Sequence, residues 1–254
     1  MPIDLNADLG ESSGSRASGN DAALLRLVTS VNVACGLHAG DPTTLRRTVQ
    51  LAAGAGAAVG AHPGFFDPEG FGRRDVRLTP EEVEDLVLYQ VAALAGVARA
   101  DGVHVTHVKP HGALYNRAAR DDRLAGAVAR AVRAFDPGLR LVGLAGSALL
   151  SAASREGLVP LAEGFADRAY LPDGSLAPRG TPGAVLEDPE AAAAQAVRIA
   201  VDHRVRAIDG TLVKVHADTL CIHGDTPGAV GLARAVRHAL ERAGVQVKSL
   251  TIDD

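Results

Sequence analysis

Short apolar strand segments alternate with helical segments along the whole chain, and this order constrains the fold more than any other feature. The alternation is typical of right-handed βαβ units, which build a parallel sheet. About seven such units in 254 residues favour an α/β fold, an irregular (β/α) barrel of about seven parallel strands. An open doubly wound sheet is the alternative. The predicted strands cover residues 2–10, 30–35, 57–63, 103–110, 139–146, 158–164 and 218–225.

The predicted helices have recognisable starts. The segment TPEE from Thr79 has the pattern of a capping box with proline at the first helical position, and it predicts a helix over 79–102. Asp41, which is followed by proline, is typical of a helix N-cap. One further helix is expected to start near Asn20. Others are expected to cover residues 45–56, 119–135, 147–157, 189 onward and 228–244.

The segments between these elements do not divide the chain into domains. Two stretches without a hydrophobic period, 63–78 and 165–188, are predicted to be long loops, and residues 205–216 are predicted to form a small hairpin. Glycine and alanine are spread through the periodic segments instead of being collected in a linker. We therefore expect one domain, residues 1–254.

Composition excludes several classes of protein. Hydrophobic residues make up 47% of the chain and charged residues 22%, as in a globular protein with a sizeable core. A net charge of −4 and only 3% aromatic residues argue against nucleic acid as a partner. No signal peptide and no apolar run of membrane-spanning length is present, so a cytoplasmic protein is expected. The two cysteines are too few for a disulfide framework.

Ionisable side chains gather where the predicted strands end. Parallel α/β folds place ligand sites beyond the carboxyl ends of their strands, so we expect these side chains to converge. A lone histidine at a strand end is commonly a loop residue bonded to the backbone, whereas four that converge indicate chemistry. In chain order the residues are Asp8, Glu11, His38, Asp41, His62, Lys109, His111, Glu163, Asp167, His223 and Asp225.

Other kinds of site have weaker support. Aspartate and histidine at several strand ends could hold a divalent metal such as zinc, although no HExxH or CxxC pattern specifies one. The glycine-rich segment from Gly54 precedes a strand instead of following it, and no GxxxxGK[ST] pattern occurs, so a phosphate-binding loop is not expected. Ser147 lacks the GxSxG pattern of a serine hydrolase.

Six motifs occur in one order along the chain: DLNADLGES from Asp4, ACGLHAGDP from Ala34, AHPGFFDPEGFGRR from Ala61, KPHGALYN from Lys109, FADRAY from Phe165 and HGDTP from His223. Together they resemble the LamB/YcsF family, also called the PxpA subunit of ATP-dependent 5-oxoprolinase. The motifs reach from residue 4 to about residue 227. Two departures from the family pattern, Ser13 in place of an aromatic residue and the segment PGFFDPEG, concern the shape of loops.

The resemblance implies a (β/α) barrel related to the glycoside hydrolase/deacetylase superfamily. It implies hydrolysis of the lactam 5-oxo-L-proline to L-glutamate with cleavage of ATP. It also implies two partner subunits, PxpB and PxpC, and ATP as a cofactor bound by this chain or by those partners.

Such a reaction needs a base for water, a donor for the oxyanion and a receptor for the substrate carboxylate. Our hypothesis is that Asp8 activates water and that His111 relays a proton to the ring nitrogen. Lys109, one of three lysines among 26 basic residues, would stabilise the charge on the carbonyl oxygen or on a phosphate transferred to it. The other residues expected to contact substrate are Asn6, Glu11, His38, His62, His223, Asp225 and, for the carboxylate, Arg73, Arg74 or Arg179.

Two other interpretations stay open. The superfamily and the supply of aspartate and histidine allow a metal-dependent deacetylase or related amide hydrolase. The missing phosphate-binding loop allows a non-catalytic protein that captures the lactam and presents it to a partner that uses ATP.

Overall fold

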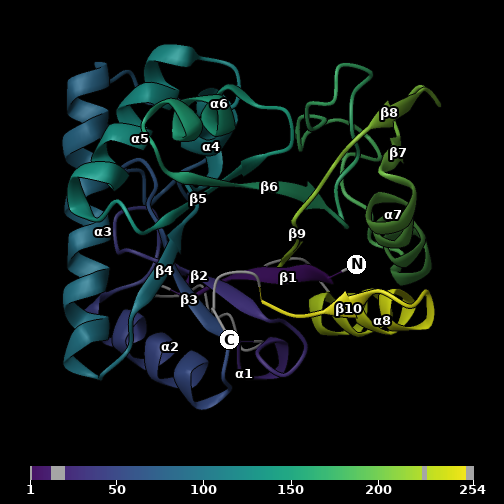
Figure 1. The fold of residues 1–254 in the computed structure, drawn as a ribbon, viewed down its shortest axis with the longest axis horizontal. Coiled ribbons are helices and arrows are strands. Elements are labelled where there is room, and N and C mark those ends of the chain that lie inside the picture. Colours follow the sequence, from purple (N-terminus) through teal and green to yellow (C-terminus); the bar gives the residue numbers. More distant parts are fainter. Residues whose placement is uncertain (1, 13–20, 225–227, 250–254) are drawn as a thin grey trace.

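The computed structural model describes residues 2–12, 21–224 and 228–249. Seven parallel strands form a closed barrel, which confirms the predicted fold class (Figure 1). Around the barrel each strand pairs with the next in the chain, and the last strand pairs with both its predecessor and the first. The strands are β1 (Pro2–Leu9), β2 (Ser30–Ala34), β3 (Ala58–His62), β4 (Val105–Val108), β5 (Arg140–Leu144), β6 (Val159–Phe165) and β9 (Thr219–His223).

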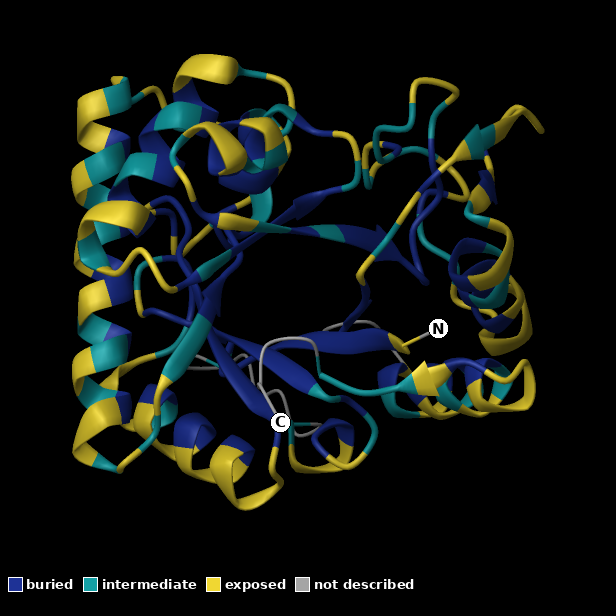
Figure 2. Cartoon of the chain, in the orientation of Figure 1, coloured by how far each residue is buried: buried dark blue, intermediate teal, exposed yellow. Residues whose placement is uncertain are grey.

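Helices surround the barrel and bury their apolar faces against the strands (Figures 1 and 2). The main hydrophobic core therefore lies between the outer face of the strands and the helices, where residues such as Leu5, Val33 and Leu94 are fully buried. The helices are α1 (Asp21–Leu24), α2 (Pro42–Gly54), α3 (Pro80–Ala100), α4 (Gly112–Ala118), α5 (Asp122–Phe135), α6 (Ala148–Arg155), α7 (Pro189–Asp202) and α8 (Ala229–Arg242).

The predicted helix starts are confirmed at α2 and α3. Asp41 accepts hydrogen bonds from the backbone of the first turn of α2, and Thr79 completes the capping box of α3. The helix expected over 119–135 instead begins at Asp122, because the carboxylate of Asp121 caps it. The residues before that cap form the short helix α4, which is too short to show a period in the sequence. A start near Asn20 lies outside the described residues.

Several smaller elements complete the structure. The predicted hairpin is confirmed as the antiparallel pair β7 (Arg204–Arg206) and β8 (Leu212–Lys214). A two-residue strand that was not predicted, β10 (Gln246–Val247), pairs with the start of β1. The segments 63–78 and 165–188 are long loops, as expected, apart from the last residue of β6 and isolated bridges. No helix in the described part of the chain is long and apolar enough to cross a membrane.

The inside of the barrel is polar. Along β1, Leu5 and Ala7 belong to the hydrophobic core, so the alternate residues Asp4, Asn6 and Asp8 point into the barrel. All three are buried, and each is held by side chains of other strands. Successive inward positions of one strand thus form successive polar layers, and the topmost layer lies at the carboxyl ends of the strands.

Candidate active site

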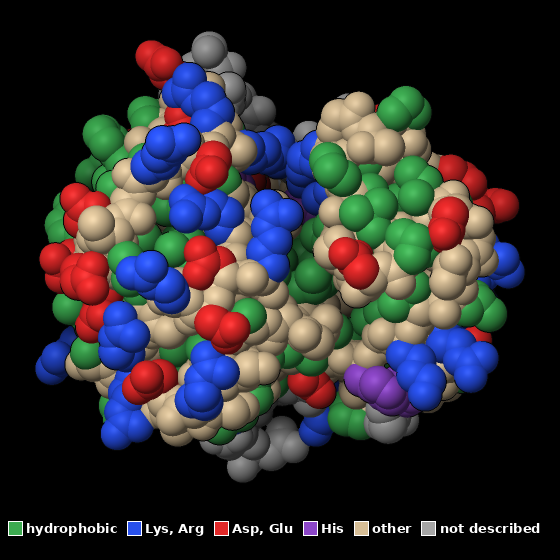
Figure 3. Space-filling model, turned by 90° about the horizontal axis from the view of Figure 1, so that it is seen from above, with side chains coloured by type: hydrophobic (Ala, Val, Ile, Leu, Met, Phe, Trp, Pro, Cys, Tyr) green, Lys and Arg blue, Asp and Glu red, His purple; other side chains and the backbone are tan. Residues whose placement is uncertain are grey.

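A cavity of about 560 Å³ opens at the carboxyl ends of the strands. Figure 3 shows this cavity as a hollow between two parts of the molecular surface, and basic side chains lie along it. One wall comes from residues 109–120 and 144–147, and the facing wall comes from residues 168–179 of the long loop after β6. Asp8, Glu11 and His62 line it too. Of the strand-end residues predicted from the sequence, those that line this cavity are Asp8, Glu11, His62, Lys109, His111 and His223.

Lys109 is buried between two carboxylates at this cavity. Its Nζ lies 3.0 Å from Asp8 Oδ1 and 2.8 Å from Glu163 Oε1, and it also contacts Asn6 and Cys221 Sγ at 3.2 and 3.1 Å. Burial on its own would lower the pKa of Lys109, but the negative charge of Asp8, to which Glu163 adds, holds that pKa well above its usual value. A fixed ammonium charge therefore lies at the site at neutral pH.

Asp8 is an ionised carboxylate whose oxygens are already hydrogen-bonded. Oδ1 accepts from the amide of Asn32 at 2.8 Å and from Lys109, while Oδ2 lies 3.3 Å from His62 Nε2. Burial raises the pKa of Asp8, but His62 and Lys109 outweigh burial and hold the pKa well below its usual value. Asp8 can therefore accept a proton at neutral pH, although the low pKa weakens it as a base.

Glu11, His38, His62 and His111 form a second buried group beside Asp8. Their ligand atoms lie within 4.8 Å of one another, so the group could hold a metal ion. Burial, followed by the neighbouring imidazoles, holds the pKa of His111 well below its usual value. Burial and His62 do the same for the pKa of His38. His38 and His111 are therefore neutral imidazoles at neutral pH, the form that binds metal ions.

The carboxylate of Asp167 holds the imidazole of His223 in place. Its Nδ1 lies 3.0 Å from both carboxylate oxygens of Asp167, and its ring stacks on Phe165. Burial raises the pKa of Asp167, but the charge of His223 and the hydrogen bonds from it lower that pKa overall. Because the ionised carboxylate accepts a hydrogen bond from Nδ1–H, Nε2 is the nitrogen left for a ligand in the cavity.

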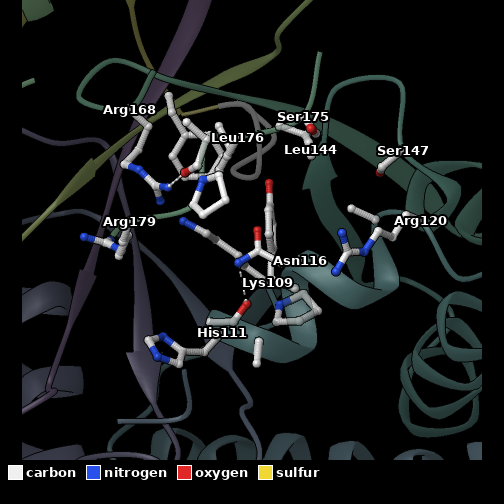
Figure 4. A pocket seen from close by; sticks show the side chains of 18 of the residues that line it. Lys109, His111, Asn116, Arg120, Leu144, Ser147, Arg168, Ser175, Leu176 and Arg179 are labelled. Atoms are coloured by element: carbon white, nitrogen blue, oxygen red, sulfur yellow. Dashed lines mark hydrogen bonds between the residues drawn. The ribbon is translucent and has the colours of Figure 1, made fainter. Parts of the chain in front are cut away.

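Four arginines at the cavity contribute positive charge. Arg73, Arg120, Arg168 and Arg179 line it, and Figure 4 shows Arg168 and Arg179 at one side and Arg120 at the other. Arg168 is buried and donates to the backbone carbonyls of Ala184 and Ala177 at 3.2 and 2.6 Å. No carboxylate among the described residues forms an ion pair with it. Burial, followed by the charge of Arg179, lowers the pKa of Arg168 to about 10. An anion in the cavity would relieve this unbalanced charge.

Comparison with known proteins agrees with the motif order. A model of the LamB/YcsF family matches residues 3–253. The chain belongs to the LamB/YcsF family. Two proteins named as a subunit of 5-oxoprolinase, from Heliobacterium modesticaldum and Nocardia farcinica, are 53% and 55% identical to it over 98% of this chain and 98% and 99% of their own lengths. The crystal structure of a lactam utilization protein from Thermus thermophilus is 52% identical, with a TM-score of 0.92, and covers 98% of this chain and 100% of that one.

The structure of this LamB/YcsF chain brings most of the predicted site residues together. Asn6, Glu11, His38 and the three proposed catalytic residues are buried side by side, and Arg73 and Arg179 line the same cavity. Arg74 is placed differently, because its exposed side chain binds Asp67 at 2.8 Å and does not line the cavity. Asp41 serves as the cap of α2. Asp225 lies outside the described residues.

Sequence reasoning missed several residues of this LamB/YcsF site. Tyr115, which donates to Glu163 Oε2 at 2.7 Å, comes from the unpredicted helix α4. Asn32 occupies the inward position of β2 opposite Asp8, and an alternation rule applied to β2 would have found it. No sequence pattern marks Arg168 as a site residue, because an arginine in a long loop is ordinarily exposed to solvent. His107 is buried in the barrel and contacts Asn32 at 3.0 Å.

Proposed function

We propose that this chain is the lactam-hydrolysing component of an ATP-dependent 5-oxoprolinase, which converts 5-oxo-L-proline to L-glutamate. The observation that carries the proposal is a buried Lys109–Asp8 centre at a cavity whose wall holds the buried Arg168, which has no ion-pair partner in the described part of the chain. A small lactam that bears a carboxylate presents a carbonyl group for the first feature and a negative charge for the second. The names of the relatives from Heliobacterium modesticaldum and Nocardia farcinica support the same substrate.

The proposed chemistry uses residues at the cavity. Asp8 takes a proton from a water molecule as the water oxygen attacks the ring carbonyl carbon. The carbonyl oxygen becomes negative, and the ammonium of Lys109 stabilises it. The C–N bond of the ring then breaks, and the nitrogen takes up a proton to become the amino group of glutamate.

His223 is the better placed carrier of that last proton. A relay by His111, as the sequence suggested, would have to run through His62, because its Nε2 binds the Phe71 carbonyl at 2.8 Å and its Nδ1 lies 3.0 Å from His62 Nε2. His223 lines the cavity and has its Nδ1 held by Asp167. This is the arrangement in which a carboxylate orients an imidazole for proton transfer.

Partner subunits and ATP belong to the proposal. The relatives are named as one subunit of 5-oxoprolinase, which implies an assembly of several chains. We propose that the partners are PxpB and PxpC and that ATP is bound by them or jointly with them, because the sequence has no phosphate-binding loop. The cytoplasmic location expected from the sequence stays a prediction.

The direct test measures glutamate released from 5-oxo-L-proline in the presence of ATP. The purified chain is assayed alone, then with PxpB and PxpC, and the partners are assayed without it. Glutamate from the complete mixture only, with ATP consumed in step, is the expected result. Absence of glutamate from a mixture whose partners are active with another member of the LamB/YcsF family would contradict the proposal.

Two substitutions on different sides of the cavity should separate substrate binding from proton transfer. Arg168→Met removes the charge proposed to hold the substrate carboxylate, so KM for 5-oxoproline should rise about 10- to 100-fold, the loss expected for a hydrogen bond to a charged group. His223→Gln should instead lower kcat, by about 10²-fold or more. Steady-state kinetics of the complex measure both. Arg130→Met, at an ion pair between α3 and α5, is the control and should change neither value.

A metal-dependent amide hydrolase is the second candidate, and the buried group of three histidines and Glu11 favours it. Hydrolysis of an acetylated amine or amide by this chain without ATP and without partners, abolished by a chelator, would support that candidate over the oxoprolinase.

A further inference from the structure

The imidazoles of His62 and His111 face each other with two nitrogens that cannot form a hydrogen bond when both rings are neutral. His62 Nδ1 lies 2.7 Å from the Lys109 carbonyl oxygen, and His111 Nε2 lies 2.8 Å from that of Phe71. A carbonyl oxygen only accepts hydrogen bonds, so each of these nitrogens carries the ring hydrogen. When both rings are neutral, the remaining nitrogens, His62 Nε2 and His111 Nδ1, present lone pairs to each other at 3.0 Å.

Further possible ligand atoms lie close to this contact. Glu11 Oε1 lies 3.3 Å from His111 Nδ1 and 4.0 Å from His62 Nε2. His38 Nε2 lies 3.6 Å from Glu11 Oε1. His38 is completely buried, and neither of its nitrogens has a hydrogen-bond partner among the residues that the structure describes. A buried imidazole without a partner is costly, so His38 needs a group that accepts its lone pair.

We propose that Glu11, His38, His62 and His111 together bind one divalent transition-metal ion, such as zinc. In a tetrahedral site with bonds of about 2.1 Å, neighbouring ligand atoms are roughly 3.4 Å apart. The separations of 3.0, 3.3, 3.6 and 4.0 Å bracket that spacing. Three imidazoles and a carboxylate suit zinc and its first-row neighbours better than calcium or magnesium.

The surroundings of the group are those of a metal site. Histidine ligands ordinarily donate their other ring hydrogen to a carboxylate or a backbone carbonyl, as His62 and His111 do here. A proton on His62 Nε2 could relieve the contact with His111, but it would leave both nitrogens of His38 without a partner among the described residues. A metal ion would bind one of those two nitrogens as well.

The metal would lie beside the proposed catalytic centre. Glu11, His62 and His111 line the cavity, whereas His38 does not. Asp8 Oδ2 is 3.3 Å from His62 Nε2, so the ion would lie next to the carboxylate proposed to activate water. His111 then acts as a ligand in place of the relay role expected from the sequence. Metal binding goes beyond the oxoprolinase function, which does not require it.

Metal binding is tested on the isolated chain, without substrate or partners. The protein is stripped with a chelator, dialysed against Zn²⁺ or Co²⁺ and then against buffer, and its metal content is measured by elemental analysis. We expect about one equivalent per chain and, with Co²⁺, the visible absorption of a four-coordinate site with nitrogen ligands. Bound metal below about 0.2 equivalents in the folded wild-type protein would overturn the proposal, whether or not the complex makes glutamate.

Variants locate the site. His38→Ala and His111→Ala should each weaken Co²⁺ binding at least tenfold and change the visible spectrum. His104→Ala, at an exposed histidine, is the matched control and should bind like wild type. Circular dichroism shows whether each variant is folded. If His38→Ala is not folded, His38→Gln is used in its place. One equivalent of metal with an unchanged spectrum in folded His38 and His111 variants would place the ion elsewhere and overturn the assignment.

Discussion

Replacing Lys109 with methionine is expected to lower glutamate formation by the assembled complex about 10²- to 10³-fold, the effect of removing a fixed charge from a developing oxyanion. The change also leaves Asp8 and Glu163 buried without their shared cation. Breaking a buried ion pair from one side typically costs about 3–5 kcal/mol of stability. Denaturant unfolding therefore has to be measured beside the kinetics.

A double variant separates the two effects of that change. Glu163→Gln, added to Lys109→Met, removes one of the two uncompensated charges while keeping the acceptor for Tyr115. It should recover part of the lost stability without recovering activity. If the folded Lys109→Met protein keeps activity within a few-fold of wild type, Lys109 serves the fold alone and its proposed catalytic role is wrong.

Asp8→Asn is expected to lower kcat about 10²- to 10⁴-fold, the range found when a general base is removed. Asparagine has nearly the same shape and still offers an oxygen to Asn32 and Lys109, but it cannot take a proton from water. The assay is again glutamate release with saturating 5-oxoproline and ATP in the complete complex.

Asp4→Asn is the matched control for Asp8→Asn. Asp4 is a buried carboxylate on the same strand, but it accepts hydrogen bonds from Thr29, Ser30 and Thr219 deep in the barrel and does not line the cavity. Its replacement should lower stability and leave kcat per folded molecule unchanged. Equal losses of kcat at both positions would mean that Asp8 acts through the packing of the barrel and not as a base.

The alternation of strands and helices was enough to predict the barrel, because parallel strands joined by helices have few ways to close. The convergence of the strand-end residues followed from the same rule. The sequence could not show which partners each side chain has. Lys109 is separated from Cys221 by 112 positions, and the opposed lone pairs of His62 and His111 depend on carbonyl groups of two loops. Such contacts exist only once three-dimensional packing fixes them.

Arg168 and α4 show two further limits of prediction. A seven-residue helix has too few turns to show a hydrophobic period, so nothing in the segment from Gly112 announced that Tyr115 would reach Glu163. Arg168 is buried because the long loop after β6 folds back over it and supplies two carbonyl acceptors. Neither fact can be derived from residue type or from spacing along the chain.

The pairing of β1 with β9, which closes the barrel, limits how early during synthesis the site of this protein can form. The two strands are separated by most of the polypeptide, yet Asp8 lies opposite His223 across them. Contacts of such large sequence separation form slowly, since the entropy of closing a long loop opposes them. A nascent chain emerging from the ribosome has His62 of β3 and His111, the N-cap of α4, early, but it cannot complete the site until residue 223 has left the exit tunnel. Translation products that end before residue 223 therefore lack His223 and cannot form a full site.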